Sequence, residues 1–505
     1  MITLEGAALR AAAWIAALVP QADPAGEERA PGEVVLEAIS LRDARGRSIA
    51  AERGRLSVAE NRQAEESAVI ELAFVRLKST SPTPGAPIVY LHGGPGGSAT
   101  PAAADPEALA SWARYLELGD VVLLDQRGCG ASKPRMTRAL REAPPADLFR
   151  DRASLSRFLA AASREVLEQF RAEGVDIAGY TTEQSADDLE DLRAALGAGR
   201  LRLLAFSYGT HLALATIRHH ESSIESAVLI GVEGPPHTRK LPTTYDAQWR
   251  KLARMVASDP ELAPRIPDLT ALLQRVVDRA EREPFVVRLP GPAVGRASTV
   301  EVGAHGLKLI LIADLGDVSD LPVFPRLLFD LDRGDTAVLT WFVTKRYRMF
   351  AQLPTLLFTM DPASGASEGR ALDIRQQAQR SLLGDAMDLG FPEVDAVWNM
   401  PIAGDDFRWP IVSDVRTLFV SGTLDCNTPP YQAEEVRWGF RRSEHLILEG
   451  AGHETWMQLP DVHAAIHRFL GGEAAGAGAV AVPPLRFVPL EGFDPQRAHP
   501  SVPRR

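Results

Sequence analysis

Residues 201–214 read LRLLAFSYGTHLAL, and this stretch decides which fold the chain is expected to adopt. An apolar run of strand length, LRLLAF, is followed at once by a run with a helical pattern, and Ser207 lies at the junction. A serine on a sharp turn between a buried strand and a helix is typical of a nucleophile elbow, which holds the hydroxyl above the sheet. Such a turn requires small residues two positions to either side. Gly209 meets this requirement, and Ala205 departs from the usual glycine by one methyl group. Because the five-residue string is a weak signal alone, the rest of the chain has to support it.

The composition predicts a soluble globular enzyme or binding protein. The chain has 505 residues, of which 45% are hydrophobic and 24% charged, and its formal net charge is -11. The negative charge and the lack of a Lys/Arg cluster argue against a nucleic-acid partner. No uninterrupted apolar run reaches the ~18 residues of a membrane span. Cys129 and Cys426 are the only cysteines, which excludes a disulfide framework and a cysteine-rich zinc site.

The N-terminal residues are open to two interpretations. Arg10 precedes an apolar run, AAAWIAALV (11–19), which has the layout of a short secretory signal. Glu5 before this run and the lack of a clean A-x-A site after it favour a helical N-terminal extension instead. The localisation, cytoplasmic or exported, stays open between the two.

Apolar runs of strand length alternate with helical segments through much of the chain. Besides the run before Ser207, they are VIELAFVRL (69–77), PIVYLH (87–92), DVVLLD (120–125), SAVLIGV (226–232), RTLFVSG (416–422) and HLILEG (445–450). Among the helical segments, SADDLEDLRAALG (185–197) has Ser185 as its expected N-cap and Gly197 at its end. Continuous apolar strands that alternate with helices predict an α/β fold with a mostly parallel sheet covered on both faces.

The regular alternation breaks between about residues 233 and 405, where the sequence is rich in aromatics and prolines and mostly helical in pattern. We therefore expect a helical cap inserted into a larger core. The predicted organisation is an N-terminal extension or signal segment (1–30), the first part of the core (31–232), the inserted cap (233–405), the second part of the core (406–470) and a C-terminal extension (471–505).

Two glycine-rich loops follow predicted strands. HGGPGGS (92–98) lets backbone approach a ligand closely, and its Gly94–Pro95 bond is a candidate for a cis peptide. A backbone N–H from this loop, together with that of Tyr208, would form an oxyanion hole. The second loop lies in GDVVLLDQRGCGAS (119–132), where we expect Asp125 and Arg127 to brace HGGPG by a salt bridge or backbone hydrogen bonds.

A nucleophilic serine also needs a base and an acid that orients it. SGTLDCNTPP (421–430) places Asp425 just past one late strand, and LILEGAGHETW (446–456) places His453 just past the next. The order Ser…Asp…His is the chain order of α/β-hydrolases. The rivals of Asp425 are Asp405 and Asp406, which precede any predicted strand.

Taken together, HGGPGGS, DQRGCGAS, AFSYGT, SGTLDCNTPP and GAGHE resemble the α/β-hydrolase serine peptidases of the proline iminopeptidase and tripeptidyl aminopeptidase group. The resemblance covers about residues 50–235 and 410–470 and matches the cap only weakly. It implies the α/β-hydrolase fold, with Ser207 as nucleophile, His453 as general base and Asp425 as the residue that orients it. By the same resemblance, Gly94 and Tyr208 supply the oxyanion N–H groups.

The predicted chemistry is acyl transfer through an acyl-enzyme, with a short peptide as the substrate. No metal-ligand spacing such as H-E-x-x-H occurs, so neither a metal nor another cofactor is expected. An aminopeptidase must also recognise a free amine, for which buried carboxylates are suited. Glu233, directly after a predicted strand, and Asp361 in the cap are the candidates. The alternative for Glu233 is an ion pair with Arg239 or Lys240.

Three functions remain open at this stage. The first is a serine aminopeptidase that releases N-terminal residues, with proline among the candidates. The second is an esterase or amidase that acts on small non-peptide acyl substrates with the same triad. The third is a binding protein on a hydrolase fold, against which the intact Ser, His and Asp argue. The sequence carries no sign of an oligomeric state.

Overall fold

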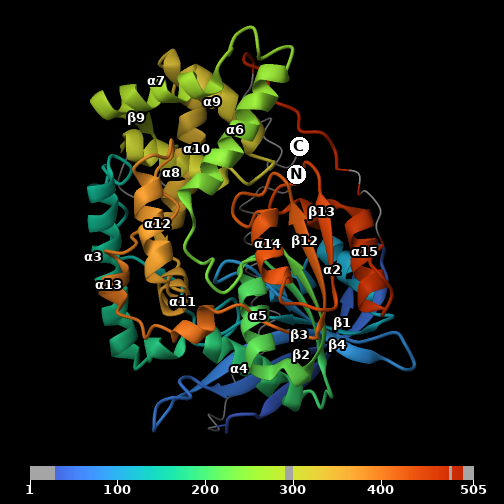
Figure 1. Cartoon of the computed structure of the whole chain (residues 1–505). Helices are drawn as coiled ribbons and strands as arrows, with labels where there is room; N and C mark the ends of the chain where they lie inside the picture. Colours follow the sequence, from blue (N-terminus) through green and yellow to red (C-terminus); the bar gives the residue numbers. More distant parts are fainter. Residues whose placement is uncertain (1–28, 291–298, 477–479, 481, 493–505) are drawn as a thin grey trace.

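A nine-stranded sheet forms the centre of the computed structural model, which describes residues 29–290, 299–476, 480 and 482–492 (Figure 1). The possible signal segment falls almost entirely outside these residues. The strands of the sheet are β1 (Val34–Arg42), β2 (Ser48–Ala59), β3 (Val69–Leu77), β4 (Gly85–Leu91), β5 (Gly119–Leu124), β7 (Leu201–Phe206), β8 (Ile224–Ile230), β12 (Arg416–Gly422) and β13 (Ser443–Leu448). Their spatial order is β1-β2-β3-β5-β4-β7-β8-β12-β13.

The sheet is mostly parallel, as predicted. Strands β5, β4, β7, β8, β12 and β13 pair in parallel, and each contains or overlaps an apolar run that the sequence marks as a strand. The unexpected part is the other edge, where β1, β2 and β3 form an antiparallel meander joined to β5. β1 has no fully buried position, and β2 mixes exposed, partly buried and buried positions along a sequence with charged residues, so neither strand forms the continuous apolar run by which the other strands were predicted.

Helices cover both faces of the sheet. Those around the sheet are α2 (Pro106–Trp112), α3 (Arg152–Glu173), α4 (Thr182–Ala195), α5 (Tyr208–His220), α14 (Pro430–Arg437) and α15 (Pro460–Leu470). Residues of α2 and α15 pack in one apolar core, and residues of α3, α4, α5 and α14 pack in the other. The core that contains residues of α3, α4, α5 and α14 continues without a break into the segment between β8 and β12.

The chain between β8 and β12 is mainly helical, and its described residues add no strand to the large sheet. We call residues 231–415 the cap segment. Its helices are α6 (Pro242–Ser258), α7 (Leu269–Arg282), α8 (Ala304–Asp314), α9 (Phe324–Asp332), α10 (Ala337–Phe350), α11 (Leu357–Ser364), α12 (Glu368–Ala378) and α13 (Asp395–Trp398). Two short antiparallel pairs accompany them: β9 (Phe285–Arg288) with β10 (Thr299–Val302), and β11 (Gln352–Leu353) with β6 (Arg138–Ala139). The predicted domain limits themselves stay a prediction.

One predicted helix start is wrong. Helix α4 begins at Thr182, and its N-cap is Thr181, whose hydroxyl accepts a hydrogen bond from Gln184 N. Ser185 lies inside the first turn, where its hydroxyl donates to Thr181 O. Thr181, four residues before Ser185, supplies the same capping chemistry as a serine, so the helix begins about one turn earlier than predicted. No helix within the described ranges is both long and apolar enough to cross a bilayer.

Candidate active site

Ser207 occupies a strained turn between β7 and α5. Its backbone has φ 54 and ψ -127, a region that non-glycine residues rarely adopt, and its N–H donates to Ile230 O at 2.9 Å. Two neighbouring glycines leave no room for a side chain. A Cβ on Gly209 would lie 2.1 Å from Leu91 O, and a Cβ on Gly93 would lie 2.7 Å from the Cβ of Ser207. The close packing of β4 against this turn therefore explains why small residues surround the serine.

A continuous hydrogen-bonded line joins Ser207, His453 and Asp425. His453 Nε2 lies 2.9 Å from Ser207 Oγ, and His453 Nδ1 lies 2.7 Å from Asp425 Oδ2. His453 follows β13 and Asp425 follows β12, so the carboxyl ends of neighbouring parallel strands bring them to one edge of the sheet. The structure thus places the three predicted residues together, in the geometry that a nucleophile, a base and an orienting acid require.

The surroundings of Asp425 favour its ionised form. Burial alone would raise the pKa of this carboxyl, but the His453 imidazole and the hydrogen bonds from Thr428 outweigh burial and lower it. Asp425 Oδ1 accepts from Asn427 N at 2.8 Å and Thr428 N at 3.0 Å, while Oδ2 accepts from Thr428 Oγ1 at 2.6 Å. Conversely, burial would lower the pKa of His453, but the charge of Asp425 outweighs it and raises that pKa. The imidazole is therefore a stronger base than a free histidine.

Thr428 is a residue that the sequence interpretation missed. Its hydroxyl lies 3.1 Å from His453 Nδ1 as well as 2.6 Å from Asp425 Oδ2, so it joins the acid and the base. It lies three residues after Asp425 in SGTLDCNTPP, a motif that was read only for its aspartate. The rivals Asp405 and Asp406 are exposed in a short 3-10 helix, and Asp405 pairs with Arg408.

The glycine-rich loop after β4 runs beside the serine. A Cβ on Gly93 would come 3.3 Å from Ser207 Oγ, so this backbone passes next to the hydroxyl. Gly94 adopts φ 133 and the Gly94–Pro95 bond is cis. Tyr208 opens helix α5, where backbone N–H groups without helical partners favour negative charge. The assignment of Gly94 and Tyr208 to an oxyanion hole stays a prediction.

Asp125 braces the end of that loop, as expected. Its Oδ1 accepts hydrogen bonds from Ser98 Oγ at 2.8 Å, Ala99 N at 2.7 Å and Thr100 N at 3.0 Å, and its Oδ2 accepts from Thr100 Oγ1 at 2.6 Å. One buried carboxylate therefore holds the chain that leaves HGGPGGS.

The expected role of Arg127 is wrong. Its fully buried guanidinium binds Asp188 through Nε at 2.8 Å and Nη2 at 2.6 Å, and it also donates to Glu60 O and Gly179 O. Arg127 thus ties the end of β2 and helix α4 to the loop after β5 instead of contacting HGGPG. Side chains of neighbouring residues in the loop point to different parts of the fold, which the local motif could not reveal.

Glu233 lies near the triad but already has a cation. Two residues before it, Gly231 packs against the candidate base, since a Cβ on this glycine would lie 3.3 Å from His453 Cε1. The backbone N–H of Glu233 donates to Thr210 Oγ1 at 2.8 Å. Its carboxylate forms an ion pair with Lys240 Nζ. Burial alone would raise the pKa of Glu233, but Lys240 outweighs it and lowers that pKa. The ion pair considered as the alternative from the sequence is therefore present.

Asp361 is the second buried carboxylate, on helix α11. Burial and then the charge of Glu233 raise the pKa of Asp361 well above its usual range. Within the described part of the chain, Asp361 Oδ1 has no hydrogen-bond partner. A buried carboxylate oxygen without a partner is costly unless a ligand satisfies it.

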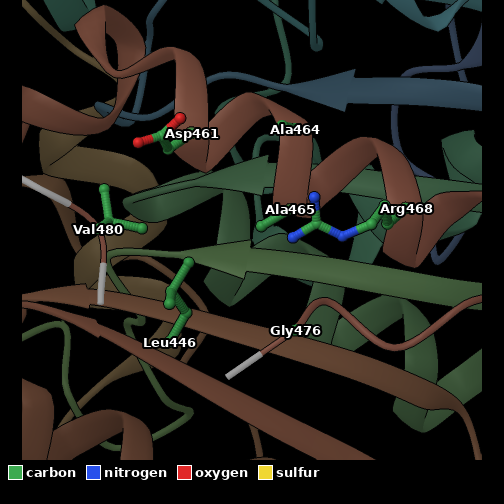
Figure 2. Close-up of a pocket in the computed structure, with 7 residues that line it drawn as sticks. All are labelled: Leu446, Asp461, Ala464, Ala465, Arg468, Gly476 and Val480. Carbon is green, nitrogen blue, oxygen red and sulfur yellow. The ribbon is translucent and has the colours of Figure 1, made fainter. Parts of the chain in front are cut away.

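The cavity in Figure 2 lies elsewhere. It has a volume of about 190 Å³ and is lined by residues of α15, β13 and the segment after α15, including Leu446, Asp461 and Arg468. No triad residue lines it. Among the described residues, no cluster of His, Cys, Asp and Glu has the arrangement of a metal site.

Comparison with known proteins agrees with this geometry. A family model described as alpha/beta hydrolase fold matches residues 86–316, and a model described as TAP-like protein matches residues 393–474. The chain has the α/β-hydrolase fold. The two matched regions hold the candidate serine and the candidate acid and base, respectively.

Three relatives confirm the resemblance of this chain to peptidases. A tripeptidyl aminopeptidase of Streptomyces coelicolor is 37% identical over 152 residues, 28% of each chain. A proline iminopeptidase of Neisseria meningitidis is 26% identical over 183 residues, 35% of this chain and 44% of the relative. The serine protease Hip1 of Mycobacterium tuberculosis is 29% identical over 196 residues, 36% of each chain. The matches thus span less than half of each relative's length.

Proposed function

We propose that this α/β-hydrolase is a serine aminopeptidase that releases N-terminal residues, with proline among the candidates, from short peptides. The single observation that carries the catalytic part is the line from Ser207 Oγ through His453 to Asp425, with distances of 2.9 and 2.7 Å. The similarity to relatives named tripeptidyl aminopeptidase and proline iminopeptidase supports a peptide as the acyl donor.

The reaction proceeds in two halves. Ser207 Oγ attacks the scissile carbonyl while His453 Nε2 takes its proton, and Asp425 stabilises the imidazolium that forms. The negative oxygen of the tetrahedral intermediate faces the N–H groups of Tyr208 and Gly94. His453 then gives its proton to the leaving amine, which departs and leaves the acyl-enzyme. Water, deprotonated by His453, hydrolyses the ester in the second half.

Asp361 supplies the recognition of a free amine in this proposal. Its Oδ1 is buried and without a hydrogen-bond partner among the described residues, whereas Glu233 is paired with Lys240. An ammonium group would satisfy the free oxygen and, as a positive neighbour, would stabilise the ionised carboxylate. Glu233 adds negative charge nearby, since it is one of the groups that raise the pKa of Asp361.

Paired substrates test the proposal. Prolyl and alanyl anilides with a free amine, their N-acetylated forms and a short-chain nitrophenyl ester are incubated with the protein, with Ser207→Ala and the exposed Ser222→Ala as matched variants. Cleavage of the free-amine anilides alone, lost in Ser207→Ala and kept in Ser222→Ala, is the expected result. Equal rates for free and acetylated anilides would contradict the aminopeptidase.

The second candidate is an esterase or amidase that uses the same triad. The Glu233–Lys240 ion pair favours it, because one of the two carboxylates predicted to bind an amine is already neutralised. Fast hydrolysis of the nitrophenyl ester, together with indifference to acetylation, would favour this function over the aminopeptidase.

A further inference from the structure

A loop of the cap segment contacts the backbone of the candidate base. Residues 314–320 connect the end of α8 to the next 3-10 helix, and Gly316 O accepts a hydrogen bond from His453 N at 2.9 Å. The contact is tight, since a Cβ on Gly452 would lie 2.6 Å from both Gly316 O and Val318 Cγ1. We refer to residues 314–320 as the base-contact loop.

The same loop also contacts the residues that follow the candidate acid. A Cβ on Gly316 would lie 3.3 Å from Cys426 Sγ and 3.4 Å from Asn427 Nδ2. Gly316 therefore lies between the loop after β12 and the loop after β13. A shift of the base-contact loop would move His453 relative to its partners.

One lysine joins the two ends of the base-contact loop. Lys345 Nζ, on helix α10, donates to Asp314 Oδ1 at 3.0 Å and to Asp320 Oδ2 at 2.6 Å. Both carboxylates are buried, with Asp314 4% and Asp320 1% exposed. Arg346 also donates to Asp314. Because Asp314 and Asp320 are the first and last residues of the loop, the lysine restrains the conformations open to the residues between them.

A buried glutamine provides a second attachment. Gln248 Nε2, on helix α6, lies 3.3 Å from Leu315 O of the base-contact loop and 2.7 Å from Leu424 O, directly before Asp425. The amide thus connects the base-contact loop to the backbone of the acid. Two cap helices, α6 and α10, therefore each hold the loop through one side chain.

We propose that Lys345 is a positioning residue, which fixes the base-contact loop and through Gly316 the orientation of His453. The inference rests on the proposed function, in which His453 is the general base. It gives the cap segment a role in catalysis: without the lysine, the base-contact loop no longer holds the backbone of His453 in the position that aligns its Nε2 with Ser207 Oγ.

The test uses three variants of the full chain. Lys345→Met removes the cation, and Lys345→Arg keeps it. Arg326→Met is the matched control, because Arg326 pairs with the buried Asp330 in the same cap segment, and within the described ranges its hydrogen bonds go to Asp330 and Pro489 O and none to the base-contact loop. Each variant is assayed for its thermal unfolding midpoint, for kcat and KM on a free-amine anilide, and for the rate of inactivation by a fluorophosphonate. The fluorophosphonate reports the reactivity of Ser207 independently of peptide specificity.

We expect Lys345→Met to lower both kcat and the inactivation rate about ten- to a hundredfold, since a misplacement of about 1 Å costs up to that much. The KM should change little, because the loss affects the transition state. Lys345→Arg should keep most of both rates. Arg326→Met should keep both rates even if its unfolding midpoint falls as far as that of Lys345→Met.

Two results would overturn the proposal: wild-type reactivity of Lys345→Met towards the fluorophosphonate, or an equal loss in Arg326→Met. If Lys345→Met fails to fold, Lys345→Gln provides the measurement, because it removes the charge but keeps a hydrogen-bond donor to the two carboxylates; wild-type reactivity there would also overturn the proposal. A wild-type chain that reacts with the fluorophosphonate but cleaves no peptide contradicts the aminopeptidase alone. A wild-type chain that does not react contradicts both proposals.

Discussion

Replacement of Asp425 by asparagine tests the triad with almost no change of shape. Oδ1 keeps its hydrogen bonds from the backbone of Asn427 and Thr428, so the loop should stay in place. The other oxygen, which lies 2.7 Å from His453 Nδ1, becomes an NH₂ donor. His453 Nδ1 must then accept, which moves the ring proton to Nε2, 2.9 Å from Ser207 Oγ. In this tautomer the imidazole cannot take the serine proton.

The wrong tautomer should lower kcat by about 10⁴-fold, the loss expected of such a change in a serine triad. At about 1.4 kcal/mol per factor of ten, this corresponds to roughly 5.5 kcal/mol of transition-state stabilisation. The pH dependence should change as well. Asp425 now raises the pKa of His453 against the effect of burial, so without its charge that pKa falls. A base is active above its pKa, so the acid limb of kcat/KM should move to lower pH.

The assay is kcat/KM on a free-amine anilide across about pH 5 to 9, the range in which a histidine base titrates. Asp406→Asn is the control, since Asp406 is an exposed rival for the same role. If Asp425→Asn keeps more than about a tenth of kcat, the loss is far below that of an orienting acid and the assignment is refuted. An equal loss in the control would refute it too.

Three further predictions concern recognition and stability. Asp361→Asn should lower the ratio of free-amine to N-acetylated anilide hydrolysis about ten- to a hundredfold, the worth of one hydrogen bond to a charged group; an equal fall for both substrates would contradict amine binding. Gly209→Ala should destabilise the chain by about 1–3 kcal/mol in urea unfolding, because its Cβ would meet Leu91 O at 2.1 Å, whereas Gly199→Ala, with no atom within 4 Å, should not. Arg127→Met should cost about 1–3 kcal/mol, because Glu60 O and Gly179 O lose a buried donor while Asp188 keeps only Arg62 as its cation, and a wild-type urea midpoint would refute this.

The sequence predicted the triad because each of its residues lies in the loop or turn just after an apolar strand. Ser207, Asp425 and His453 follow β7, β12 and β13, and in a parallel sheet the carboxyl ends of the strands meet at one edge. Local pattern therefore sufficed to bring together residues as far apart as 207 and 453. The strand positions of β3, β4, β5, β7, β8, β12 and β13 followed from the same apolar runs.

Where a partner lies far along the chain and belongs to no strand, local pattern gave no answer. Arg127 illustrates this: DQRGCGAS contains an aspartate and an arginine two residues apart, which suggested a common task. In the fold, Asp125 turns to the chain after HGGPGGS and Arg127 turns to Asp188, 61 residues away. The charged residues of a motif indicate that ion pairs form. Which partners they have depends on the packing of α4 against the sheet, which the motif does not contain.

Glu233 shows the same limit with a consequence for specificity. The pairing with Lys240 depends on how the chain turns after β8, where Glu233 N is held by Thr210 Oγ1. In the proposed aminopeptidase, the carboxyl group left for a substrate amine is that of Asp361, which lies on α11 in the cap segment and not in the core. Recognition and catalysis would then come from different parts of the chain. The triad follows the strands of the sheet, which the apolar pattern predicts, whereas the amine contact lies in the cap segment, where that pattern predicts no positions. Relatives that share the triad can therefore differ in substrate through the cap alone.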